Sequence, residues 1–165
     1  MRETTEMRGA VTFELTDAAG NVVHRQERCN RIVKSGRRLV AQLFGGVTSG
    51  TPPSPVTHVG VGTDGTAATD DNTQLGGQRG GRNPITQITY TDFEEKPPGS
   101  TETVKRTRAS LTAVFDFSEA NGPDPIREAG VFTAAGGGVM YNRVTLEPVT
   151  KTNAFKLTVL WDVVF

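Results

Sequence analysis

His24 and His58 are the two histidines of the chain, and histidine is the side chain best suited to act as a base near neutral pH. A hydrolytic triad would need one of them in contact with a nucleophile and an acid. Neither lies in a recognisable local motif, and the chain contains no G-x-S-x-G sequence. Because His24 falls in an amphipathic strand and His58 in a short strand, structural roles are favoured and a hydrolase is the disfavoured alternative.

Cys29 is the single cysteine, so an internal disulfide and any multi-cysteine metal site are excluded. A lone thiol at the end of a strand could be reactive. More often such a cysteine packs as a small apolar side chain.

The segment Gly60–Gly65 matches the pattern G-x-G-x-x-G and follows a strand-like run. A dinucleotide site would need a helix to begin at the last glycine, inside a βαβ unit. The residues that follow, Thr66–Thr73, have no apolar periodicity. The glycines therefore predict a strand that ends in a tight turn.

A long polar segment, Thr63–Gly81, carries several side-chain oxygens that a hard cation could use. They belong to Asp64, Asp70, Asp71 and Asn72. The spacing of an EF-hand loop is missing, and Asp is common in turns, so cation binding stays an open alternative. A structureless stretch of this length in a compact domain is usually functional or held by a neighbour.

Two further patterns favour exposed loops over chemistry. Gly76–Arg82 resembles an RGG patch, but one short instance at zero net charge is weak evidence for RNA binding and a partner-held loop is favoured. The pair Glu94-Glu95 stands beside Lys96 and two prolines, which predicts a solvated tip and no acid–base pair.

The elements that would position these residues are predominantly strands. The 165 residues include 19 Gly and 9 Pro, and long runs of Ala, Leu, Glu and Lys are absent. This composition favours short strands joined by turns. The length predicts one domain at residues 10–165 after an N-terminal arm at residues 1–9.

The charge balance argues against several partner classes. Eighteen basic and eighteen acidic side chains give a formal charge of zero, so no global field favours nucleic acid or an anionic membrane. No apolar run reaches membrane-spanning length, and the charged first residues do not look like a signal peptide. The expectation is a soluble protein made in a cytoplasm, without cofactor.

The C-terminal run Phe155–Phe165 holds the only Trp and is the most apolar strand of the chain. A frayed terminus of this composition would invite aggregation, so it is expected at the centre of the fold. Six other runs either alternate apolar and polar residues or are rich in strand-forming residues. They span 9–16, 22–28, 56–62, 85–93, 111–117 and 126–144. The last run is interrupted by a turn at Gly136–Gly138. Residues 101–108 are charged and strand-permissive.

One segment has helical spacing. Apolar residues between Cys29 and Gly46 recur with the helical period, Gly45-Gly46 is a stop signal, and Ser35 is a plausible N-cap. With turn signals at sandwich spacing, the sequence predicts a mainly β fold, an antiparallel β-sandwich of jelly-roll type with one short α-helix.

Three stretches together resemble small virion proteins of tailed bacteriophages. Asn30–Phe44 resembles their N-x-I-v-x-x-G helix, and Thr57–Thr63 with the loop to Leu75 resembles their I-x-x-i-a-v-G-t-G-t segment. Ile126–Phe132 with Met140–Val144 resembles their I-x-E-a-G-L-f and m-l-a-R-v pair. Pro148–Lys151 and Leu157–Trp161 also fit, and the order covers most of residues 10–165.

The resemblance implies a non-enzymatic component of a phage or phage-like particle, in the tail, baseplate or tail fibre, that acts by oligomeric assembly. Its partners would be further copies of itself, as a trimer or ring, and other virion proteins, with no specific nucleic acid and no membrane. No catalytic, cofactor or metal residues carry over. Alternatives are a capsid decoration or head–tail connector protein, and a glycan-binding module.

Partner contacts are predicted in the N-terminal arm and in two loops, 63–82 and 93–100. The residues expected to make these contacts are Thr63, Asp64, Asp70, Asp71, Arg79, Arg82, Glu94 and Glu95.

Overall fold

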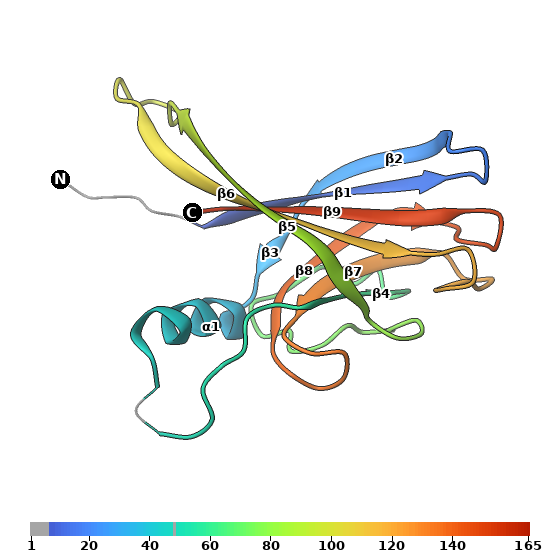
Figure 1. Cartoon of the computed structure of the whole chain (residues 1–165), viewed down its shortest axis with the longest axis horizontal. Coiled ribbons are helices and arrows are strands. Elements are labelled where there is room, and N and C mark those ends of the chain that lie inside the picture. Colours follow the sequence, from blue (N-terminus) through green and yellow to red (C-terminus); the bar gives the residue numbers. More distant parts are fainter. Residues whose placement is uncertain (1–6, 48) are drawn as a thin grey trace.

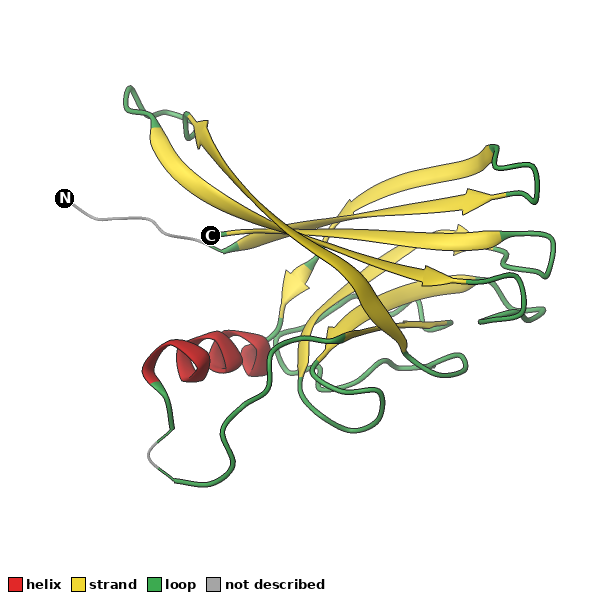
Figure 2. Ribbon diagram, in the orientation of Figure 1, coloured by secondary structure: helices red, strands yellow, loops and turns green. Residues whose placement is uncertain are grey.

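Nine strands and one helix make up the computed structural model, which describes residues 7–47 and 49–165 (Figures 1 and 2). In chain order they are β1 (Arg8–Thr16), β2 (Val22–Cys29), β3 (Arg31–Ile32), α1 (Lys34–Gly45), β4 (His58–Gly62), β5 (Asn83–Glu95), β6 (Val104–Phe115), β7 (Ile126–Phe132), β8 (Met140–Val149) and β9 (Lys156–Val164). The predicted arm at residues 1–9 lies largely outside the described part, which begins at Met7.

The strands form one antiparallel sheet in the order β2-β1-β9-β6-β5-β4-β7-β8-β3. Its two ends meet, because β2 and β3 run on from each other through Asn30. β2 pairs with β1 on one side, and β3 pairs with β8 on the other. Counted as one strand, β2 and β3 close the sheet into an eight-stranded antiparallel β-barrel.

The predicted β-sandwich is therefore wrong, although the mainly β composition with one helix is right. A sandwich and a barrel share the same alternation of buried residues and the same turn spacing. They differ in whether the two edge strands of the sheet pair with each other. That pairing depends here on a two-residue strand, Arg31–Ile32, which lies within the segment predicted to be helical.

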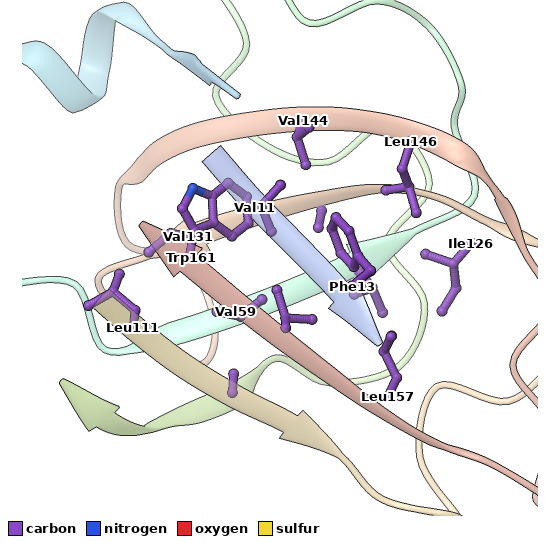
Figure 3. Close-up of a cluster of buried hydrophobic side chains, with 14 of the residues drawn as sticks. Val11, Phe13, Val59, Leu111, Ile126, Val131, Val144, Leu146, Leu157 and Trp161 are labelled. Atoms are coloured by element: carbon purple, nitrogen blue, oxygen red, sulfur yellow. The ribbon is translucent and has the colours of Figure 1, made fainter. Parts of the chain in front are cut away.

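The C-terminal strand is central, as predicted, since β9 pairs with β1 and with β6. Alternate residues of these strands point into the barrel, where Trp161 is fully buried among side chains such as Val11, Phe13 and Leu111 (Figure 3). Burial of this apolar interior is the main source of stability. Phe165 is 40% exposed, but its backbone exchanges two hydrogen bonds with Thr107.

The helix fills the later part of the predicted segment 29–46, but its cap is two residues earlier than predicted. Val33, not Ser35, occupies the N-cap position, and the Ser35 hydroxyl donates instead to the carbonyl of Met140. The predicted stop is confirmed, because Gly46 ends α1 with a φ of 75°. The helix lies outside the barrel against β8, and Gly36 makes this approach possible: a Cβ there would lie 1.9 Å from the Tyr141 carbonyl oxygen (Figure 2).

Strands β5 and β6 form a long hairpin whose turn extends past the ends of the neighbouring strands (Figure 1). The runs 101–108 and 111–117, which the sequence separates, belong mainly to the single strand β6. No helix of the described residues has the length and apolar character needed to cross a bilayer.

Candidate functional site

A buried ion pair lies on the outer side of β7 and β8. The Arg143 Nε donates to the Glu128 carboxylate at 2.8 Å, and the side chains are 2% and 0% exposed. Both residues sit in largely buried strands, at positions that face away from the barrel interior. Burying two charges is tolerable only when their remaining polar atoms also find partners.

Those partners come from the loop between β4 and β5. Glu128 accepts the backbone N–H groups of Gly76 at 3.1 Å and Gly77 at 2.7 Å. Arg143 donates to the Thr66 carbonyl at 2.9 Å and to the Asp64 carboxylate at 3.1 Å. The loop is thus fastened across β7 and β8 by its own chain.

The Asp64 side chain is held by two kinds of donor. The Thr66 hydroxyl and N–H both bond to it, and together with Arg143 they keep the pKa of Asp64 below its ordinary value. Close packing continues at Gly76, where a Cβ would lie 2.0 Å from the Asp64 carboxylate. The polar loop therefore packs closely against this side of the barrel.

Asp70 connects the same loop to β3 and α1. Its carboxylate receives Arg31 at 2.7 Å and Arg37 at 3.1 Å, and these two guanidinium groups hold the pKa of Asp70 below its usual range. All three side chains are partly exposed, so the pairs position the helix more than they stabilise the fold.

The two arginines at the end of the loop also bind their own chain. Arg79 donates to the Asp124 carbonyl. Arg82 lies over the Phe132 ring, 3.4 Å from its centroid, and donates to the carbonyls of Ala134 and Gly137. Burial lowers the pKa of Arg82.

The loop residues predicted as partner contacts thus fall into two groups. Five of them have hydrogen bonds within the chain: Thr63, Asp64, Asp70, Arg79 and Arg82. Asp71 is exposed at the loop surface. Contact of this loop with a partner stays a prediction, and the surface it would offer is ordered in advance.

The oxygens proposed for a cation are spread over different interactions. Asp64 faces Arg143 and Asp70 faces Arg31 and Arg37, while the Asn72 amide oxygen accepts from Thr69 and Arg143. Within residues 7–47 and 49–165, no three His, Cys, Asp or Glu side chains are grouped so that they could hold a metal ion.

The histidines lie in β2 and β4, and the glycine motif spans the end of β4. His24 contacts Gln26, and His58 contacts the Thr57 hydroxyl. The G-x-G-x-x-G segment ends β4 and leads into the loop, as predicted. A Cβ on Gly62 would collide with Glu128, so this glycine makes room for the buried pair.

A cavity of about 820 Å³ opens at the end of the barrel where β1 begins and β9 ends. Its lining mixes Arg8, Arg108 and Asp162 with Cys29, and Arg108 stacks over the Phe93 ring at 4.8 Å. Because the lining carries charges of both signs, it favours neither an anionic nor a cationic ligand. Sequence reasoning did not find this cavity because its walls come from distant strands.

The projecting β5–β6 hairpin carries the most exposed strand surface of the molecule. All residues from Thr86 to Asp92 are exposed, whichever face of β5 they occupy. Ile88 is 44% exposed and Tyr90 is 74% exposed. Beyond Ile85, β5 pairs with β6 alone among the described residues, so one edge is open. Open apolar edges of this kind are sites of strand addition.

Both glutamates predicted as contacts lie at the outer end of this hairpin. Glu94 is exposed opposite Lys105. Glu95 pairs with Arg8 and with Arg106, and these partners lower the pKa of Glu95. The candidate functional site is therefore the exposed surface formed by residues 86–95 of the hairpin, and contact of this surface with a partner stays a prediction.

Comparison with known proteins adds no relative to this picture: no protein-family model, curated protein or solved structure matches the chain.

Proposed function

We propose that the protein is a non-enzymatic structural subunit of a phage or phage-like particle, in its tail, baseplate or tail-fibre region, and that it works by assembling with copies of itself and with other particle proteins. Residues 30–44, 57–75 and 126–144 resemble small virion proteins, and this resemblance supports membership of a phage or phage-like particle. The single structural observation that supports assembly is the exposed, open-edged strand β5.

An open edge is unusual in a protein that remains alone. Natural sheets protect such edges with charges, proline, bulges or a covering segment. In β5 the carboxylates Asp92, Glu94 and Glu95 protect only the outer end, and the stretch from Gln87 to Thr91 has no charged residue. A subunit that is covered in its assembly needs no further protection there.

The fastened loop supports the same function. Because residues 63–82 are already held by Glu128, Arg143 and Phe132, a partner that contacts their outer surface would not have to order them. Pre-ordering lowers the entropic cost of association. The contacts predicted for Asp71 and its neighbours would then be made by a stiff surface.

Particle association is the test. Particles from a producing culture are purified on a density gradient and probed with an antibody against the chain, and a soluble host protein serves as the control. We expect the chain in the particle fraction, at a tail, baseplate or fibre position in a reconstruction. A chain that stays a monomer and never sediments with particles would refute the proposal, and density in the head would reassign it to the capsid or connector.

A further inference from the structure

The backbone of β5 presents a defined set of hydrogen-bonding groups at its open edge. Thr107 exchanges both backbone bonds with Phe165, so Thr107 faces β9. Backbone direction alternates along a strand, so Ser110, three residues on, faces β5. Its partner Thr89 must then face β6, and the N–H and C=O groups of Ile88 and Tyr90 face the open edge.

This edge is complementary to itself when two copies are related by a two-fold axis at Thr89. In that antiparallel register Ile88 lies opposite Tyr90 of the second copy, and the pair is repeated by symmetry. Each Ile88–Tyr90 pair would exchange two backbone hydrogen bonds, because both residues direct their groups outward. The two most exposed apolar side chains of β5 would cover each other.

Charge and apolar pairing favour this register over its neighbours. With the axis at Thr89, Asp92 lies opposite Thr86, and within the open stretch 86–92 no carboxylate faces another carboxylate or an apolar side chain. Moving the axis to Tyr90 places Ile88 against Asp92, and moving it to Asp92 places two carboxylates together. Moving it to Ile88 places each Tyr90 opposite Thr86, so the Ile88–Tyr90 pairs are lost.

We propose that two copies of this chain pair through the β5 edge, antiparallel and centred on Thr89, to form an isologous two-fold interface. The inference rests on the self-association in the proposed function and names the surface and symmetry that carry it. An isologous contact closes on itself, so this interface by itself makes a pair, and larger rings would need a second surface.

Cysteine cross-linking tests the register. In a Cys29→Ser background, Thr89→Cys places two thiols across the axis in a non-hydrogen-bonded pair, with Cα atoms about 4.5 Å apart, within disulfide range. Thr91→Cys is the matched control, since Thr91 is also exposed and lies on the same face of β5. Its two copies would be offset by four residues, about 13 Å along the strand. We expect mild oxidation to cross-link Thr89→Cys severalfold more than Thr91→Cys.

Sedimentation velocity provides the second measurement. Tyr90→Glu puts a carboxylate opposite Ile88 of the second copy, two residues from Asp92 on its own strand, and we expect it to shift the dimer to monomer. Val22→Glu is the control, since Val22 is 54% exposed but lies on β2, away from this edge. Circular dichroism confirms that both variants are folded.

The possible failures separate the two proposals. Equal cross-linking of both cysteines, a wild-type monomer at every concentration, or self-association that Tyr90→Glu leaves intact would overturn the β5 pairing without touching particle membership. A Thr89-centred dimer that never sediments with particles would overturn the proposed function and leave the interface standing.

Discussion

At the residue scale, the fold depends on one charged pair placed among apolar side chains. Glu128 and Arg143 occupy largely buried strands, and the loop from β4 to β5 closes over them. Sequence reasoning included both in the virion resemblance but assigned neither a role. The signal available was the opposite charge of one residue in each of two successive strand-like runs, since a buried charge needs a partner.

Removing one member of this pair should strongly destabilise the protein. Arg143→Met leaves the buried Glu128 carboxylate without its cation and frees the loop at Thr66 and Asp64. We expect a loss of about 3–5 kcal/mol in the free energy of unfolding, measured by urea denaturation, because an uncompensated buried charge remains. Arg127→Met, which changes an exposed arginine on the neighbouring strand β7, should have little effect. Similar losses in both variants would contradict this account.

The Asp64 carboxylate makes part of the stability depend on pH. Its folded pKa lies below the ordinary value of 3.8, first because of the Thr66 hydroxyl. A lowered carboxyl pKa contributes stability that is fully present above 3.8 and disappears as pH falls through the folded pKa. We expect the wild type to be more stable than Asp64→Asn near neutral pH, with the difference shrinking below pH 3.8. Urea denaturation curves that stay equally separated at every pH would contradict this.

At the element scale, local patterns predicted strands well and long-range pairings poorly. The alternation of Val11, Phe13 and Leu15 identified β1, and the Gly136–Gly138 turn was correctly placed between β7 and β8. The helix start was missed because Ile32 has helical spacing relative to Leu39 but pairs with β8 instead. Tertiary pairing overrode a local periodicity there.

The contact of α1 with β8 should be sensitive to a single methyl group. Gly36→Ala would place a Cβ against the Tyr141 backbone, so helix or strand must move, and we expect a loss of about 1–3 kcal/mol in thermal or urea unfolding. Gly45→Ala in the same helix meets nothing within 4 Å and should stabilise by about 0.5–1 kcal/mol. Equal effects of the two substitutions would show that the packing of α1 is not what Gly36 serves.

At the scale of the whole molecule, closure of the barrel is the feature that composition and turn spacing did not predict. It needs contacts of β2 and β3 with β8, which is far away in the sequence. The Gln26 amide makes two of them, donating to the Glu147 carbonyl and accepting from the Glu147 N–H, both at 3.1 Å. The Gln26 side chain thus makes the two hydrogen bonds to the Glu147 backbone that a paired strand would otherwise make with its own backbone.

Loss of that side chain should open the junction between β2 and β8. We expect Gln26→Ala to cost about 1–2 kcal/mol in urea denaturation, from two hydrogen bonds. It should also accelerate hydrogen exchange at the Glu147 amide more than elsewhere in β8. Glu27→Ala, at the exposed neighbouring position, should leave that exchange unchanged. Unaltered exchange in Gln26→Ala would mean that the barrel is closed by its other contacts.

Trp161 gives the molecule an optical reporter at its centre. It is the only tryptophan, its ring is fully buried, and its indole N–H has no acceptor among the described residues. Its emission should therefore be blue-shifted in the intact barrel and move to longer wavelength when water enters. Fluorescence of the unlabelled wild type can thus follow whether any treatment, partner or substitution breaches the interior.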